Sequence, residues 1–391
     1  SFHIGCFVEE GNSDLGVQLG DVNGDGLVDF VRATEYGPYN STWLNKPIAA
    51  SYLLANITNE YDGITMIQYK KSTYLDNIGT YIYNSTEYKI SKLPFNLWVV
   101  SNITKDPKVS GQGIELIEYN YSQGFYDFKS KEFRGFGYSE EKRSDGTIIK
   151  HYFHQDDAKK GSEFKTEVLD GQNNLFKKTE RWFDNSTSIN SYFINLLRVE
   201  TEFTHDKIQD NPKVKNTTYS YDEFGNIIVI ENLGDINVNS DDRFEYYQYL
   251  NNSALWVVNK PKHYFLLMQD NLTIVRQTWF KYDNLAYNKE PNKGDITNKE
   301  EFLNLTTNIS TTYIYNEFGN LINEINANNQ NTTYVYGIHD STNTFPSRII
   351  NAKGHISNYV YDLGTGNLLS QVDSNKNIIN YSYDVFGRRD K

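Results

Sequence analysis

Cysteine is almost absent from this chain of 391 residues, which contains only Cys6. A single cysteine cannot close an internal disulfide, so no disulfide framework holds the fold, and cysteine gives no information about the compartment. Methionine (2 residues) and proline (8 residues) are also scarce. Long apolar runs are missing too: runs such as residues 255–258 and 265–268 fall far short of the roughly 20 residues that cross a bilayer. We therefore predict no membrane span.

Basic residues are outnumbered, because 38 Lys and Arg stand against 50 Asp and Glu, for a net charge of -12. Contact with nucleic-acid phosphates needs a basic face, so we predict no nucleic-acid partner. The sequence has no Gly-x-Ser-x-Gly elbow, Walker loop or dinucleotide fingerprint, and Cys6 has no activating context. We predict that the chain is not an enzyme. A glycosidase or lyase that uses a carboxylate pair is the enzymatic alternative that remains open.

Aromatic residues are abundant, with 31 Tyr and 22 Phe, and they favour β-sheets whose faces are covered by rings. Residues 42–102 alternate short strand-like runs (SYLLANI, GITMIQYK, YIYNSTEYKI, LPFNLWVV) with turn residues, and no helical period appears. Residues 284–299 are polar, contain Pro291, and are predicted to form a long loop. The fold class that follows is all-β.

A tyrosine-rich pattern recurs in the second half of the chain. Residues 217–228 read TTYSYDEFGNII, 311–322 TTYIYNEFGNLI, 358–368 NYVYDLGTGNL and 381–388 YSYDVFGR. In one copy, Asn316 can accept a hydrogen bond from the backbone two residues on, and Gly319 supplies the positive φ of a tight turn. Residues 321–325 alternate apolar and polar and predict the returning strand. Because a lone hairpin is marginally stable in water, we expect these hairpins to pair with one another.

The pattern Tyr-x-Tyr-Asp-x-x-Gly resembles the YD repeat of Rhs proteins, of the B and C components of insecticidal Tc toxin complexes, and of teneurins. The resemblance implies that the repeats wind as one β-strip into a hollow shell. The residues that carry it are Tyr219, Tyr221, Asp222, Gly225, Tyr313, Tyr315, Gly319, Tyr359, Tyr361, Asp362, Tyr381, Tyr383, Asp384 and Gly387.

A loop near the start of the chain has the spacing of a Ca²⁺ site. Its predicted ligands are Asp21, Asn23, Asp25, Leu27 (through its carbonyl) and Asp29. Arg32 stands where an EF-hand needs a bidentate Glu, and the flanks look like strands, so the site is not an EF-hand. The loop resembles the FG-GAP repeat of integrin-type β-propellers, which implies the end of a propeller blade. An Asp-Gly turn without metal is the alternative.

Residues 132–137 read EFRGFG. Gly135 and Gly137 predict a bend, Phe133 and Phe136 are expected to be buried, and Arg134 to pair with an acidic group or stack on a ring. The segment resembles a signature in the middle region of Tc toxin B components, between their propeller and their shell. The predicted regions are a propeller-blade remnant (1–45), a Tc-B-like middle β region (46–150) and a β-shell region of repeats (151–391).

The His151-Tyr-Phe-His154 segment precedes Asp156 and Asp157 and invites a zinc assignment. On a strand, however, residues three apart point to opposite faces, and no third ligand has suitable spacing. We predict a surface strand that ends in an Asp-rich turn.

Asn-x-Ser/Thr acceptors for N-glycans are about twice as frequent as composition predicts. They are Asn40, Asn56, Asn84, Asn102, Asn120, Asn185, Asn216, Asn251, Asn271, Asn304, Asn308, Asn331 and Asn380. This excess favours a secreted or cell-surface glycoprotein.

The resemblance implies a non-enzymatic scaffold of a secreted Rhs or Tc-B-like protein, whose β-shell encloses or presents a polypeptide cargo. The expected partners are this cargo or neighbouring subunits of an assembly. The alternative is a glycosylated adhesion or filament protein that uses the same shell as a rigid module, which the glycan acceptors favour. Because the sequence begins without Met and stops within a predicted hairpin, we expect a piece of a longer protein.

Overall fold

The computed structural model describes residues 17–20, 22, 28–32, 41–45, 53–83, 85–184, 188–189, 192–193, 196–205, 211–304, 307–339 and 342–390. Across these residues the regular structure is β-strand, apart from the short 3₁₀ turns η1 (Ser72–Tyr74) and η2 (Asn239–Asp241), so the all-β prediction is confirmed. The chain divides into two compact units, Ser1–Asn216 and Thr217–Lys391, which we call unit 1 and unit 2.

Unit 1 begins with a small antiparallel sheet in the order β1-β2-β3. Its strands are β1 (Val17–Gly20), β2 (Asp29–Arg32) and β3 (Ser41–Trp43). Phe30 of β2 pairs with Trp43 of β3, and their ring centroids lie 5.2 Å apart in an edge-to-face contact. Such a cross-strand aromatic pair helps to hold a sheet of this size together.

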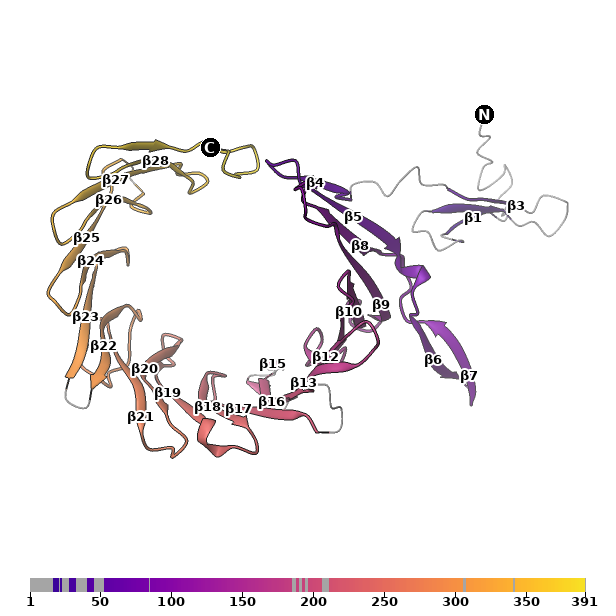
Figure 1. The fold of residues 1–391 in the computed structure, drawn as a ribbon, viewed down its shortest axis with the longest axis horizontal. Helices are drawn as coiled ribbons and strands as arrows, with labels where there is room; N and C mark the ends of the chain where they lie inside the picture. Colours follow the sequence, from indigo (N-terminus) through magenta and orange to yellow (C-terminus); the bar gives the residue numbers. More distant parts are fainter. Residues whose placement is uncertain are drawn as a thin grey trace, which may run out of the picture. The chain divides into compact units, whose positions relative to one another are not determined.

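The main sheet of unit 1 is an antiparallel meander (Figure 1). Its strands are, in order, β4 (Asn56–Thr58), β5 (Ile64–Lys71), β8 (Trp98–Asp106), β9 (Glu115–Asp127), β10 (Glu132–Arg143), β11 (Ile148–Phe153), β12 (Glu163–Leu169), β13 (Leu175–Asp184) and β16 (Leu196–Thr204). The short strands β14 (Ser188–Ile189) and β15 (Tyr192–Phe193) pair with each other, and β17 (Lys213–Tyr221) crosses the boundary between the units.

A hairpin of β6 (Ile78–Tyr83) and β7 (Thr86–Ser91) interrupts this meander. Strand β5 pairs directly with β8, so the hairpin adds no strand to the main sheet and stands away from it in Figure 1. The run YIYNSTEYKI therefore belongs to two paired strands rather than to one. The run LPFNLWVV was predicted as a strand over its whole length, which is wrong, because β8 begins only at Trp98.

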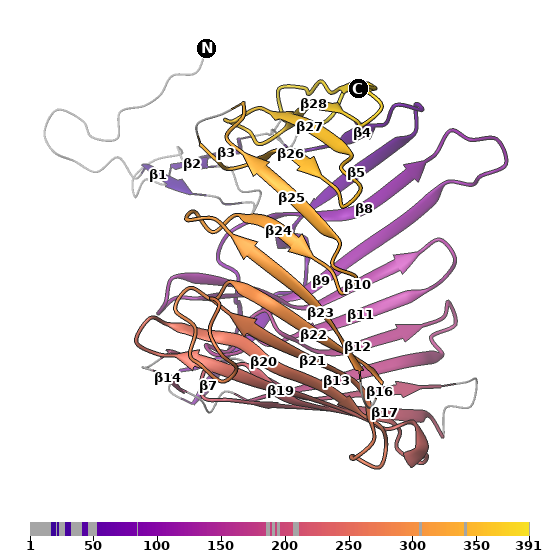
Figure 2. The same ribbon diagram turned by 90° about the vertical axis from the view of Figure 1, so that its left-hand side faces the viewer.

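Unit 2 is a second antiparallel meander, in which each strand pairs with the next (Figure 2). Its strands are β18 (Ile227–Asp235), β19 (Arg243–Asn252), β20 (Val257–Leu267), β21 (Ile274–Tyr282), β22 (Ile296–Asn304), β23 (Thr307–Tyr315), β24 (Leu321–Ile325), β25 (Asn331–Tyr336), β26 (Pro346–Ile350), β27 (Ile356–Tyr361), β28 (Leu368–Val372) and β29 (Ile378–Asn380). The expected return strand, residues 321–325, is β24.

The predicted loop at residues 284–299 is wrong at its C-terminal end, because β22 starts at Ile296 and pairs with β21. What precedes β22 is an ordered loop. The carboxylate of Asp283 accepts hydrogen bonds from four consecutive backbone N–H groups, those of residues 292–295, at 2.7 to 3.1 Å. The Asn252 side chain donates to the carbonyl of the buried Pro291 at 3.0 Å.

Few large apolar side chains are buried in the described parts of the two sheets. They are Leu93, Ile117, Ile148, Leu169, Leu250, Leu267 and Tyr282. A single layer of sheet cannot enclose a thick core, and among the described residues we find no second layer over the main sheet of either unit. We infer that hydrogen bonds, cross-strand rings and tight turns supply much of the cohesion.

Candidate functional site

The tyrosine-rich copies end in one shared turn. In the copy at residues 311–322, Asn316 Oδ1 accepts hydrogen bonds from the N–H groups of Phe318 (3.0 Å) and Asn320 (2.9 Å), and Gly319 has φ 82°. The same two bonds, to the residues two and four positions on, form at Asp222 and at Asp384. Gly225 and Gly387 there have φ 85° and 74°. The turn at Asp362 is one residue longer, with Gly366 at φ 76°.

The same turn also closes connections that the sequence analysis did not single out. Each starts with an Asp or Asn whose Oδ1 accepts N–H groups two and four residues on. These residues are Asp170, Asn326, Asn351 and Asp373. Their positive-φ positions hold Asn173, Asn329, Gly354 and Lys376. An Asp or Asn three residues before a Gly or Asn, between two β-type runs, is the signal that could have found three of them, whereas the turn at Asp373 has Lys376 at that position.

Tyrosine hydroxyls connect successive hairpins of unit 2. The Tyr336 hydroxyl donates to the carbonyl of Leu321 at 3.1 Å, and the Tyr383 hydroxyl to that of Leu368 at 2.9 Å. Each acceptor is the first residue after a preceding shared turn. Burial raises the pKa of Tyr336, so its hydroxyl keeps its proton at physiological pH. In these two cases a tyrosine hydroxyl thus ties its own segment to the residue that follows an earlier shared turn.

Other tyrosines of the pattern pack as rings. Tyr359 and Tyr361 stack with centroids 6.5 Å apart, and Phe345 stacks on Tyr361 at 4.8 Å. Burial raises the pKa of Tyr313 and of Tyr315. The pattern therefore stabilises the sheet in two ways: its rings pack along the strands, and its turn closes the hairpin.

Arg134 lies at the centre of the EFRGFG segment and is buried, with 5% of its side chain exposed. Its guanidinium donates to the carboxylates of Asp127 and Asp157, and to the Gln155 carbonyl at 3.1 Å. It also lies 5.9 Å from the Phe125 ring. This arrangement joins the end of β9 to the loop after β11 through one cation.

The glycines and rings of this segment shape β10 around that cation. The register with β9 shifts between Phe133 and Phe136, and Gly135 between them has φ 79°. Phe133 contacts Phe136 (centroids 5.8 Å apart) and Phe95 (6.0 Å). The expected burial of the two rings is wrong, because Phe133 is 37% exposed and Phe136 is only partly buried. We call Asp127, Phe133, Arg134, Phe136 and Asp157 the FRGFG centre.

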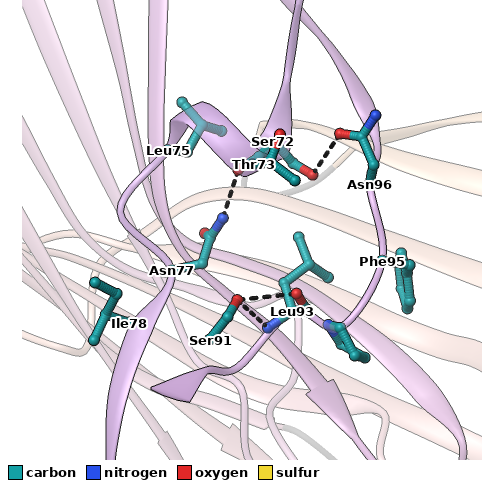
Figure 3. Close-up of a pocket in the computed structure, with 10 residues that line it drawn as sticks. Ser72, Thr73, Leu75, Asn77, Ile78, Ser91, Leu93, Phe95 and Asn96 are labelled. Atoms are coloured by element: carbon teal, nitrogen blue, oxygen red, sulfur yellow. Dashed lines mark hydrogen bonds between the residues drawn. The ribbon is translucent and has the colours of Figure 1, made fainter. Parts of the chain in front are cut away.

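The β6–β7 hairpin is fixed through its base to β9, beside this centre, and Figure 3 shows the base with its bond from Asn77 to Ser72. Asn77 is buried; its Oδ1 accepts the N–H of Gly124 at 2.7 Å, and its Nδ2 donates to the Ser72 carbonyl at 2.8 Å. A Cβ on Gly124 would lie 2.7 Å from Asn77 Oδ1 and 3.0 Å from the Phe136 ring. A cavity of about 420 Å³ lies beside this contact and is lined in part by Asn77 and Leu93. We call Ser72, Asn77, Leu93 and Gly124 the hairpin mount.

Sequence reasoning missed the hairpin mount. Asn77 follows Asp76 between two strand-like runs, which on local grounds is an ordinary turn residue. Its role depends on Gly124, which lies 47 residues further along the chain. Only the neighbouring EFRGFG segment carried a sequence signal.

A comparison with protein families places this part of the chain. Residues 9–167 match the family model of the insecticide toxin TcdB middle/N-terminal region. The match covers the FRGFG centre and the hairpin mount, and it ends before the tyrosine-rich copies. A comparison with curated proteins finds no match.

Solved structures share the fold over nearly the whole chain. The crystal structure of TcdB2-TccC3-TEV is 14% identical, with a TM-score of 0.60, over 95% of this chain and 26% of that one. TcdB2-TccC3 without its hypervariable C-terminal region matches with the same identity and TM-score, over 97% and 26%. A mutant Tc holotoxin pore of Photorhabdus luminescens is 14% identical with a TM-score of 0.57, over 95% and 25%. The chain thus spans about a quarter of the structures that it matches.

The two histidines of the TcdB-like region do not converge on a metal site. His151 Nδ1 lies 2.5 Å from Glu163 Oε1. His154 packs against the rings of Phe164 (4.8 Å) and Phe183 (6.0 Å), and burial lowers its pKa. The described residues contain no group of three or more His, Cys, Asp or Glu side chains that could hold a metal ion.

Of the predicted Ca²⁺ ligands, the structure describes only Asp29. Asp29 is buried, with 1% of its surface exposed, and its carboxylate accepts the N–H groups of Val22 (2.9 Å) and Asn45 (2.8 Å). Both bonds tie neighbouring segments to β2. Asp21, Asn23, Asp25 and Leu27 lie outside the described residues, so the Ca²⁺ site stays a prediction.

The glycan acceptors differ in exposure. Asn56, Asn120, Asn271, Asn308, Asn331 and Asn380 are exposed, and Asn102, Asn216 and Asn251 are partly buried. Asn304 lies in β22, and Asn40, Asn84 and Asn185 fall outside the described residues. Glycan attachment stays a prediction. No helix of the described chain has the length and apolarity needed to cross a membrane.

Proposed function

We propose that the chain is a non-enzymatic structural part of a secreted toxin complex, in which its antiparallel strip forms part of a shell around a polypeptide cargo. A shell wall must be continuous and stiff. A long meander is continuous because each strand pairs with the next, and it is stiff because its turns are closed by hydrogen bonds. Cargo and neighbouring subunits are the partners that follow from this role.

The observation that carries this proposal is the fold match to TcdB2-TccC3 structures over nearly the entire chain, together with the family match at residues 9–167. These matches are to toxin components, and they favour the shell over the adhesion module. The adhesion alternative retains the support of its exposed glycan acceptors, such as Asn56 and Asn380.

Protease protection tests this function. The full natural protein would be purified with any polypeptide that accompanies it, and then treated with proteinase before and after mild denaturation. An enclosed polypeptide should be cut only after the shell has been opened, whereas the same polypeptide in free form, the control, should be cut at once. A co-purifying polypeptide that is digested at the free rate would contradict enclosure.

We also propose that residues 21–29 bind Ca²⁺ at the weak affinity of extracellular modules, about 10⁻⁴ to 10⁻³ M. Ligand binding to the folded state raises its melting temperature, so added Ca²⁺ should stabilise the wild-type chain. Asp25→Ala should abolish that gain and leave melting in chelator unchanged. Equal melting temperatures of the wild-type chain with Ca²⁺ and with chelator would show that these residues do not bind Ca²⁺.

A further inference from the structure

The β6–β7 hairpin has two free edges. Strands β6 and β7 pair with each other along their whole length, and among the described residues neither strand pairs with a third. The described side chains of both strands are exposed, apart from the partly buried Gly79, and Ile78 and Ile90 are 65% and 46% exposed. Two strands without further packing are marginally stable in water. The hairpin therefore leaves room for a partner on either edge.

The base of the hairpin is held in place on both sides. Before β6, the Asp76 carbonyl accepts the N–H of Gln123 at 2.8 Å, and after β7 the Lys92 carbonyl accepts that of Tyr126 at 2.9 Å. The buried side chain of Asn77 adds its bonds within the hairpin mount. A partner would therefore not have to order the base of the hairpin on binding, which favours affinity.

Every second residue of β6 directs its backbone groups away from β7. Lys92 N–H donates to the Asn77 carbonyl at 2.8 Å, so these two residues form a hydrogen-bonded pair. Such pairs alternate with non-hydrogen-bonded ones along an antiparallel ladder, which makes Ile78, Thr80 and Ile82 the outward-facing residues. The Ile78 N–H already donates to a neighbouring carboxylate at 3.2 Å. The N–H groups of residues 80 and 82 have no acceptor in the described part of the chain.

The two edges differ in charge. Strand β6 reads IGTYIY and has no charged residue, whereas β7 (TEYKIS) has Glu87 and Lys89. Both residues stand at outward-facing positions of β7, and Lys89 Nζ lies 2.7 Å from Glu87 Oε1. Charged side chains on an edge strand oppose pairing with another strand, whereas an uncharged edge permits it. Of the two edges, β6 is the one that fits a further strand.

A cavity lies beside the start of β6. It is the cavity of about 420 Å³ next to the hairpin mount, and its apolar lining includes Ile78, Leu75, Leu93 and Phe95 (Figure 3). In strand addition to a sheet edge, backbone hydrogen bonds supply affinity and pockets for side chains supply specificity. Ile78 belongs both to the edge and to the cavity lining, so a strand along β6 passes this pocket.

We propose that β6 accepts an extended, uncharged strand of a neighbouring subunit, which places an apolar side chain in this cavity. An extended backbone fits the edge because its N–H and C=O groups recur at every second residue, as those of Thr80 and Ile82 do. The apolar lining of the cavity and the absence of charge on β6 select the side chains of the partner. This inference rests on the proposed function, in which neighbouring subunits are partners.

Hydrogen exchange of the hairpin amides tests the proposal. The full natural protein would be measured with its co-purifying subunits and again after their removal. We expect the amides of Thr80 and Ile82 to exchange about tenfold or more slowly in the complex, and those of Glu87 and Lys89 to exchange equally in both samples. Fast exchange of Thr80 and Ile82 under all conditions would overturn the proposal. Protection that rises with the concentration of the isolated protein would assign the edge to a second copy and overturn it too.

Proline variants locate the edge. Thr80→Pro removes an outward N–H of β6 and should weaken binding of the separated subunits about tenfold or more. Lys89→Pro is the matched control, because Lys89 lies opposite Thr80 and directs its N–H outward from β7. It should bind within about threefold of the wild type. Ile78→Asp, which adds a charge beside the cavity, is a second loss variant if Thr80→Pro disturbs the hairpin.

These variants also separate the hairpin from the shell. Equal binding by the wild type and both loss variants, Thr80→Pro and Ile78→Asp, would overturn the role of β6. Protease protection of the cargo should be unchanged in all three variants, because the hairpin adds no strand to the main sheet. A failure of the shell function would appear as an unprotected cargo in the wild type, whereas a failure of the hairpin inference leaves that protection intact.

Discussion

The FRGFG centre of unit 1 and the tyrosine-rich copies of unit 2 hold a sheet together in opposite ways. The centre and the adjoining hairpin mount depend on contacts that are not repeated along the chain: Arg134 joins Asp127 to Asp157, and Asn77 accepts from Gly124 beside the backbone bonds that join the hairpin base to β9. The copies repeat one turn, and the hydroxyls of Tyr336 and Tyr383 repeat one contact. A single substitution should therefore be costly in the centre and mild in the copies, because the remaining copies keep their own contacts.

The largest effect should come from Arg134→Met. Breaking a buried ion pair costs about 3–5 kcal/mol, and because Asp157 is 73% exposed and can be rehydrated, we expect about 2–3 kcal/mol. Thermal unfolding would measure the loss, and hydrogen exchange in β9 and β10 would locate it. Lys160→Met is the matched control, since Lys160 pairs with Glu132 at the surface and should cost less than about 1 kcal/mol. Equal losses of stability in the two variants would show that the ion pairs of Arg134 contribute no more than a surface ion pair.

Gly319→Val should have the next largest effect. A Cβ at Gly319 meets nothing within 4 Å, so the cost comes from its φ of 82° alone and should exceed about 1 kcal/mol. Gly319→Asn should cost only part of that, because Asn329 already holds the equivalent position of the same turn at φ 57°. Denaturant unfolding of both variants gives the comparison. A Val variant as stable as the Asn variant would mean that the turn tolerates a β-branched residue.

Tyr336→Phe should be milder. It removes the hydroxyl that ties Tyr336 to the Leu321 carbonyl, for an expected loss of about 0.5–1.5 kcal/mol. Tyr359→Phe is the control, because Tyr359 contributes a stacked ring and makes no side-chain hydrogen bond among the described residues. Hydrogen exchange at Leu321 and its neighbours should rise in the first variant only. An equal rise of hydrogen exchange in both variants would show that the hydroxyl bond of Tyr336 does not specifically protect this segment.

The sequence predicted the elements whose causes are local. The turn at Asn316 and the strand at residues 321–325 depend on residues within five positions of one another, and short patterns capture such contacts. The hairpin mount and the acid partners of Arg134 depend on contacts across many residues, for which one sequence carries no signal. The start of β22 was missed because Thr297 and Asn298 are polar, and polar residues that follow a polar stretch predict a continued loop. Their strand conformation comes from pairing with β21, which the local sequence does not indicate.

The smallest expected effect is on the pH dependence of stability, and it distinguishes shared turns that begin with a charged Asp from those that begin with a neutral Asn. Backbone N–H donation from Arg388 is the main cause that holds the pKa of Asp384 below its ordinary value, and the Asn377 side chain does the same for Asp373. A lowered pKa in the folded state adds stability above the unfolded value of about 3.9, and acid removes it as the pH falls through the folded pKa. Asn316 makes the same turn without a titrating group.

Replacing both carboxyls, in an Asp373→Asn and Asp384→Asn variant, should therefore flatten the acid side of the stability curve. At pH 7 the variant should melt slightly below the wild type, because each amide oxygen still accepts the backbone N–H groups, whereas the Asn377 and Arg388 side-chain donors lose the second carboxylate oxygen as their acceptor. Between about pH 5 and pH 2 the wild type should lose stability faster than the variant. Melting curves across this range give the measurement, and two parallel acid limbs would mean that the turn carboxylates carry no pH-dependent stability, so that the charged and neutral turns are equivalent.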